Sequence, residues 1–283
     1  MSILLDERLS RAFFYTLLLS AGIANGFAAT VILAIRELRW EAVPTLFGIG
    51  IVGLGMAGGT LMRLVEAGRD LEGLESVSWL DILAGALVLS AALFPSSAAS
   101  WVAMALVALM LRRLDRSEAF RAALMLVLLL SIHELWFRLV FRQISQPFTV
   151  LDALSVEHLL SLVLDGVSRT GNIITTPFNR LLIRDTCSSC LNMGAAMVAT
   201  AAVRSWFVAP MLRGAIPVYL RAALFILLIN LIRLAAMAVS PPIHAALHTP
   251  IGLASYDAFC LMTVVLLAVP RTSCSPASLP QRS

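Results

Sequence analysis

The sequence contains little charge and no lysine. Only 13% of its 283 residues are charged, while 59% are hydrophobic and the mean hydropathy is +0.89. The charged share is about half of that in a typical soluble domain. So little polar surface cannot cover a fold in water, which excludes a soluble globular protein. The long apolar blocks approach the ~20 residues that cross a bilayer as a helix, so we expect a polytopic membrane protein.

Because lysine is absent, the 21 basic residues are all arginines, and the formal net charge is +4. These arginines are scattered over predicted loops rather than gathered with aromatic residues in a basic patch. Nucleic-acid surfaces need such a patch. We therefore expect a lipid bilayer around this protein and no nucleic-acid partner.

Hydropathy divides the chain into eight segments that we predict to span the membrane. Two of them, 79–94 and 98–111, are short and are separated by a turn at Pro95. Backbone polar groups in lipid must be satisfied within the protein, which favours helices. The fold class predicted is an all-α bundle forming one integral membrane domain over residues 1–283. The predicted spans are 12–35, 43–65, 79–94, 98–111, 121–141, 187–204, 217–239 and 251–269.

The arginine distribution predicts the orientation. With the N-terminus inside, the short outer loops hold only Arg36 and Arg39, whereas the inner segments hold most of the other arginines. Arginine-rich loops stay in the cytoplasm. Both termini, including an inner tail at 270–283, are therefore predicted to be cytoplasmic.

The connector 142–186 is the most polar part of the chain and is predicted to lie outside. Leucines between Leu151 and Leu162 recur at helical spacing beside acidic residues, which indicates a short amphipathic helix at the interface. The following stretch, 169–177, contains Gly171 and Pro177 and is predicted to be a loop.

Chemistry is indicated first at Cys187, at the predicted outer start of the sixth span. Asp185 or Thr186 is expected to cap this helix and to leave Cys187 in its first turn. Unpaired backbone N–H groups there favour negative charge and hence the thiolate. A cysteine in this position is suited to act as a nucleophile, although a small buried hydrophobic role is the alternative.

A second feature is Arg233 inside the seventh span, with Asn230 one turn away on the same face. An arginine in the middle of a hydrophobic helix costs about 2.5–3.5 kcal/mol to insert. It either reaches back to the interface or faces a functional site, and we favour the site.

The loop 240–250 between the last two spans contributes His244 and His248. The predicted topology brings both histidines to the same membrane face as Cys187 and Arg233. A thiolate, a proton shuttle and a fixed cation are the groups that acyl transfer requires. No metal or other cofactor is expected.

These features together resemble one family, the exosortases and archaeosortases. The resemblance rests on eight spans, Cys187-Ser188-Ser189 opening a late helix, Asn230-Leu231-Ile232-Arg233 in the next, and a histidine followed by Gly252. The lead-in Gly171-Asn172-Ile173 is similar too. It covers residues 135–269; the earlier spans match only in hydrophobicity.

The resemblance implies a membrane cysteine protease or transpeptidase in a prokaryotic cytoplasmic membrane, with its active site on the outer face. Its partners would be exported proteins that end in a short motif, a transmembrane helix and a basic tail, with a lipid or glycan as a further acceptor. Cys187 would form a thioester, Arg233 would hold the oxyanion and His248 would shuttle the proton. Asn230 and Asn172 would be supporting residues, and His244 the alternative to His248.

One departure from the family pattern raises a rival function. Ser189 and Cys190 stand where members often have a glycine and an aliphatic residue, which creates Cys187-x-x-Cys190. Such a pair at a helix start is also a redox motif. The alternative is therefore a membrane thiol-disulfide oxidoreductase. Cys260 and Cys274 supply no second outer pair for it, and the cysteines and histidines lack the close spacing of a zinc site.

Overall fold

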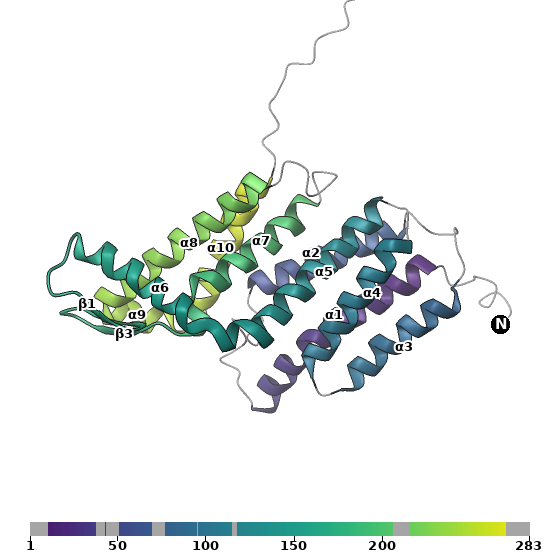
Figure 1. Cartoon of the computed structure of the whole chain (residues 1–283), viewed down its shortest axis with the longest axis horizontal. Coiled ribbons are helices and arrows are strands. Elements are labelled where there is room, and N and C mark those ends of the chain that lie inside the picture. The colour runs from purple at the N-terminus through teal and green to yellow at the C-terminus, as the bar shows by residue number, and fades with distance from the viewer. Residues whose placement is uncertain are drawn as a thin grey trace, which may run out of the picture.

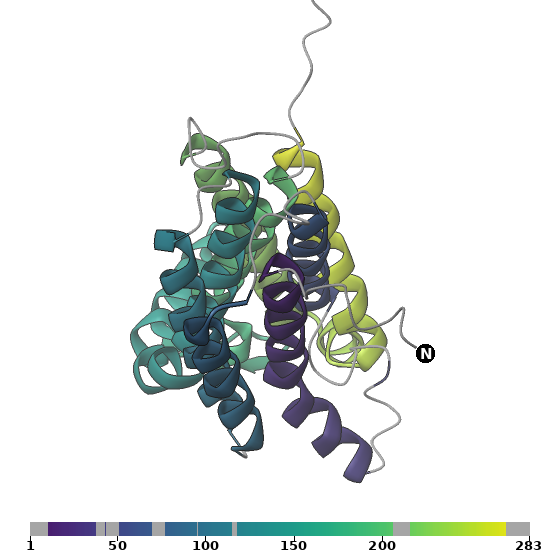
Figure 2. The same cartoon turned by 90° about the vertical axis from the view of Figure 1, so that its right-hand side faces the viewer.

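A computed structural model describes residues 11–37, 43, 51–69, 77–94, 96–114, 118–205 and 216–269. These residues are mostly helical and include one small sheet (Figure 1, Figure 2). The predicted inner tail 270–283 and most of the segment between the first and second helices lie outside the described residues.

Five helices of the N-terminal half pack into one bundle around a shared apolar cluster. Gly26 of the first helix lets Trp101 of the fourth approach closely, because a Cβ there would lie 2.6 Å from the indole. Residues 44–50 of the predicted span 43–65 lie outside the described residues. The five are α1 (Arg11–Arg36), α2 (Ile51–Arg69), α3 (Trp79–Leu93), α4 (Ser97–Leu114) and α5 (Glu118–Leu135).

Helix α5 continues through a π-helical turn, Trp136–Phe141, into α6 (Arg142–Ser161). Ile144 leaves helical geometry at φ −118°, ψ 18°, three residues before Pro147. Proline cannot donate its backbone hydrogen bond and its ring clashes with the preceding turn, so the helix bends here; Figure 1 shows α6 turned away from α5. The predicted amphipathic helix is confirmed as a helix, and it begins well before Leu151.

The segment after α6 corrects the all-helical expectation. Residues 169–177 were predicted to be a loop, but they contribute two strands to a three-stranded antiparallel sheet, in the order β1 (Ser168–Thr170), β2 (Ile173–Thr175), β3 (Arg180–Leu182). Gly171, at φ 61°, supplies the left-handed residue of the two-residue β1–β2 turn. Strands of three residues are too short to show an alternating pattern in the sequence.

The C-terminal half consists of α7 (Ser189–Arg204), α8 (Ile216–Val239), α9 (Pro241–Leu247) and α10 (Pro250–Ala268). Helices α7 and α8 pack along each other, and α10 packs against both. Helix α9 is a second correction, because 240–250 was predicted to be a loop. The Ser240 side chain accepts from the backbone N–H of Ile243, and proline occupies the first turn of α9, as is typical of a helix start.

In the part of the chain that the structure describes, three helical segments are long and apolar enough to cross a membrane: 118–161, Ile216–Val239 and Pro250–Ala268. The last two match predicted spans 217–239 and 251–269 to within one residue. Shorter apolar helices lie at Phe13–Ala28, Trp79–Leu93 and Ser97–Arg112. The structure thus supports a membrane protein by length and composition, and the eight-span topology stays a prediction.

Candidate functional site

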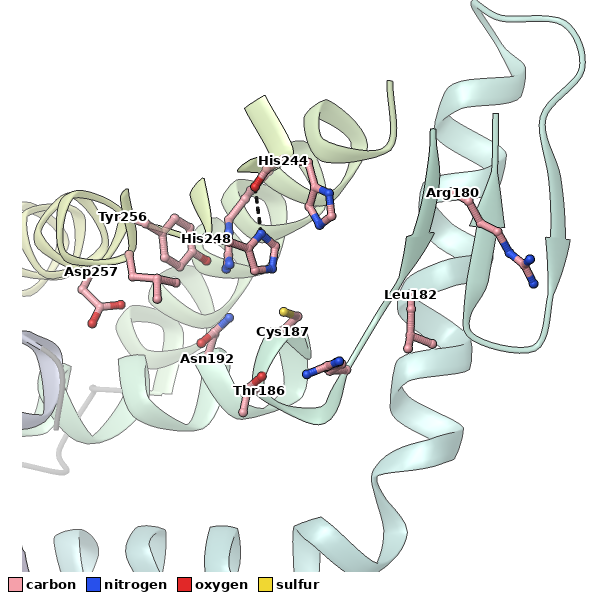
Figure 3. Close-up of a pocket in the computed structure, with 12 residues that line it drawn as sticks. Arg180, Leu182, Thr186, Cys187, Asn192, His244, His248, Tyr256 and Asp257 are labelled. Carbon is pink, nitrogen blue, oxygen red and sulfur yellow. Dashed lines mark hydrogen bonds between the residues drawn. The ribbon is translucent and has the colours of Figure 1, made fainter. Parts of the chain in front are cut away.

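A cavity of about 670 Å³ lies where the 3₁₀ turn before α7 meets β3, α8, α9 and α10. Four of the predicted site residues line it: Cys187, Arg233, His244 and His248. Cys187 comes from the 3₁₀ turn, Arg233 from α8, and the two histidines from α9 and its C-cap. Figure 3 shows Cys187 and both histidines around the same space. The fold therefore brings together the residues that sequence reasoning selected from distant segments.

Cys187 lies outside the helix in which it was predicted. It ends a 3₁₀ turn, Asp185–Cys187, and Ser188 rather than Asp185 or Thr186 is the N-cap of α7. The Asp185 carboxylate instead accepts the backbone N–H of Thr186 at 2.9 Å. The thiol is half-buried and, in Figure 3, turned toward the His248 ring. The helix dipole is therefore not what sets this cysteine apart; its neighbours in the cavity are.

The backbone donors around Cys187 are already occupied. Its own N–H donates to the Arg184 carbonyl at 3.0 Å, and the N–H of Ser188 donates to the Asp185 carbonyl at 3.1 Å. In many acyl-transfer sites the N–H of the nucleophile, or of its neighbour, holds the oxyanion. Here any oxyanion formed at Cys187 has to be stabilised by side chains.

Sequence reasoning missed Asp152, which ties α6 to the start of α7. Its buried carboxylate accepts the backbone N–H of Ser189 at 2.9 Å, while the Ser188 hydroxyl accepts that of Cys190 at 3.3 Å. Two of the free donors at this helix end are thereby satisfied. Asp152 and Ser189 are 37 residues apart, so no local pattern pointed to this contact.

Asn230 links the parts of the site. It is fully buried and donates to the Cys187 carbonyl and to the Ser189 hydroxyl, both at 2.9 Å. Its carbonyl oxygen accepts from Arg233 at 3.4 Å and from the Tyr256 hydroxyl at 3.1 Å. Asn230 therefore fixes the backbone of Cys187 relative to Arg233, which fits the supporting role expected for it.

Arg233 is only 8% exposed although it carries a charge. Its guanidinium carbon lies 4.3 Å from the centre of the Tyr256 ring, a cation–π contact that partly offsets desolvation. The buried Nε atom has no hydrogen-bond partner, and no salt bridge reaches Arg233 among the described residues. A tyrosine in an apolar helix needs a partner for its hydroxyl, and that signal could have identified Tyr256.

The two histidines differ in their hydrogen bonding. Nδ1 of His248 lies 2.9 Å from the His244 carbonyl, drawn as the dashed line in Figure 3. A carbonyl can only accept, so Nδ1 must carry a proton, and in the neutral ring Nε2 is left as the acceptor. His248 is thereby held in one tautomer, with its basic nitrogen free.

His244 packs edge-on against His248, with ring centroids 4.5 Å apart. Partial burial, and then the charge on His248, lower the pKa of His244 below its ordinary value. His244 therefore stays neutral at a pH where an ordinary histidine is already protonated.

Besides Asn230, two predicted residues do not line the cavity. Asn172 lies in the β1–β2 turn and donates to the Ile183 carbonyl at 2.8 Å, which anchors the strand leading to Cys187. Cys190 lies in the first turn of α7 and, like Cys187 and Cys260, is a free thiol. Within the described parts of the chain, no group of three or more histidine, cysteine and carboxylate side chains is placed to hold a metal ion.

A scan against protein-family models, a search of curated proteins and a search of solved structures found no match to the chain.

Proposed function

We propose that this protein is a membrane-embedded cysteine protease or transpeptidase that acts through a thioester on Cys187. The observation that carries the proposal is the single cavity lined by Cys187, Arg233 and His248. A nucleophile, a base and a fixed cation that line one cavity are the groups that acyl transfer requires.

In the proposed reaction, His248 takes the proton of the Cys187 thiol at Nε2. The thiolate then attacks the carbonyl carbon of a peptide bond, forming the C–S bond of a tetrahedral intermediate. Collapse breaks the C–N bond, and the imidazolium returns its proton to the departing amine. Water or an acceptor nucleophile next attacks the thioester and releases the thiol, so that nothing is oxidised or reduced.

Arg233 is the proposed oxyanion stabiliser. The backbone donors beside Cys187 are occupied, whereas Arg233 lines the same cavity and its Nε has no partner. A preorganised cation in a site with little water stabilises developing negative charge strongly. Asn230 acts as a positioning residue, because it binds both the Cys187 carbonyl and Arg233.

The proposed substrates are exported proteins with a C-terminal motif, a transmembrane helix and a basic tail. Cleavage would occur at the outer face of a prokaryotic cytoplasmic membrane, with eight spans and both termini cytoplasmic. The clustering of Cys187, Arg233 and the histidines in one cavity fits their placement on a single membrane face, and the arginine distribution predicts that this face is the outer one.

We expect substitution of the two histidines to have unequal effects. Replacing His248 with glutamine removes the base and should slow processing by about 10²–10⁴-fold, whereas His244→Gln should retain most of the rate. Because partial burial and the charge on His248 lower the pKa of His244, His244 stays neutral as pH falls through the range in which an ordinary histidine is protonated, so His244→Gln should keep the parent's dependence of rate on pH. Rates of tail removal between about pH 5 and 8 would check this. A normal rate of processing in His248→Gln would contradict the assignment of the base.

Thiol labelling tests the proposal against the oxidoreductase without a known substrate. Intact cells would be treated with a membrane-impermeant maleimide, with and without prior reduction, and the labelled cysteines mapped by mass spectrometry. We expect labelling of Cys187 without reduction, because it is a free thiol lining an open cavity. A Cys187→Ala variant controls for labelling at Cys190. Labelling of both cysteines only after reduction would instead favour the redox pair.

A further inference from the structure

Strand β3 and the residues after it present two arginines to the cavity. Arg180, Leu182 and Arg184 alternate along the chain and all line the cavity, whereas Leu181 and Ile183 between them are buried in the core. Successive side chains in an extended segment point to opposite faces. The pattern therefore gives this edge of the cavity two cations with one leucine between them.

The cavity has an excess of positive charge. Three arginines line it, Arg180, Arg184 and Arg233, against one carboxylate, that of Asp257. Elsewhere on the same sheet, Arg169 is paired with Glu157 at 2.9 Å. Within the described residues no salt bridge involves Arg180 or Arg184. Unneutralised guanidinium groups that share a cavity favour an anionic ligand, above all one with phosphate or carboxylate oxygens.

Arg233 independently indicates an anionic ligand. It lines the cavity, only 8% of it is exposed, and its Nε atom has no hydrogen-bond partner. Burying a cation without a counter-charge is costly. An anion bound between Arg233, Arg180 and Arg184 would supply that charge.

Exposed apolar side chains on β3 and its neighbouring segments form what we call the apolar rim. Leu182, which lines the cavity, is 48% exposed, and Phe178, two residues before β3, is 59% exposed; Leu162 and Val163 at the end of α6 are 71% and 82% exposed. Figure 1 shows β3 and the end of α6 at the same end of the molecule. A ligand that covers this rim has an apolar part as well as an anionic one.

We propose that the cavity binds the phosphate headgroup of an anionic phospholipid, with Arg180 and Arg184 holding the phosphate and the acyl chains lying against the exposed apolar rim. An acidic peptide would satisfy the arginines without accounting for these exposed side chains, so the lipid is favoured. The inference concerns binding only and does not depend on Cys187 acting as a nucleophile.

The test uses the full chain in neutral detergent and phosphatidylglycerol carrying a fluorophore on one acyl chain, with anisotropy as the readout. We expect the double variant Arg180→Gln/Arg184→Gln to bind about 30-fold more weakly, as two charge contacts at a membrane surface would give. Arg169→Gln is the matched control, because Arg169 is on the same sheet but does not line the cavity. It should bind within about twofold of the parent. Thermal melting of each variant excludes misfolding.

Competition identifies the ligand. Short-chain phosphatidylglycerol should displace the probe, whereas inorganic phosphate and a soluble acidic peptide should not. Unchanged affinity in the double variant, an equal loss in Arg169→Gln, or displacement by phosphate or peptide without displacement by the lipid would each overturn the proposal. Lipid binding is read by anisotropy and the thioester mechanism by processing of a C-terminal sorting signal, so the two proposals fail in different measurements.

Discussion

Replacing Cys187 with alanine should reduce processing of a C-terminal sorting signal to background. The thioester cannot form without the sulfur, and removing a catalytic nucleophile from a comparable triad lowers kcat by about a millionfold. Cys190→Ala should keep most of the activity, because Cys190 does not line the cavity. The measurement is the conversion of an exported test protein, carrying a transmembrane helix and a basic tail, to its shortened form by immunoblot.

The paired substitutions also decide between the two candidate chemistries. Cys187 and Cys190 are of the same residue type, three positions apart and both half-buried, so a general effect on folding should be similar for both. A dithiol oxidoreductase needs both sulfurs for turnover. Equal loss in the two variants, together with full activity in Arg233→Ala, would therefore contradict the transpeptidase.

The helices around the site were predictable because their signal is local. The segments 217–239 and 251–269 are predominantly apolar, and α8 and α10 match them to within one residue. Arg233 was conspicuous for the same reason, since a charge within such a segment is costly. Single-residue hydrophobicity was enough for these elements.

The rest of the site depends on contacts between distant segments. Whether Cys187 begins α7 or precedes it is determined by Ser188 and Asp152, and Asp152 lies 37 residues before its partner Ser189. The sheet was missed because its strands have three residues each and are held by Asn172 and by packing on α6 and α8. Neither the start of α7 nor strands of this length produce a repeating hydrophobic pattern in the sequence.

Replacing Arg233 with lysine should lower kcat by about 10²–10³-fold, the usual loss when one oxyanion donor is removed. Lysine keeps the positive charge but lacks the planar fork, so it cannot both stack on Tyr256 and direct a second donor into the cavity. Because an oxyanion contact exists only in the transition state, kcat and kcat/KM should fall together. The measurement is steady-state processing of a purified substrate in detergent.

Arg204→Lys is the matched control for this substitution. Arg204 is also buried, at 7% exposure, and its Nε likewise has no partner, but it lies at the far end of α7 from Cys187. If burial of a lysine merely destabilises the fold, both variants should lose thermal stability and activity to a similar extent. A selective loss of kcat in Arg233→Lys, with melting like that of Arg204→Lys, would assign the effect to the reaction. A rise in KM alone would instead place Arg233 in substrate binding, because contacts made equally in the ground state and transition state leave kcat unchanged.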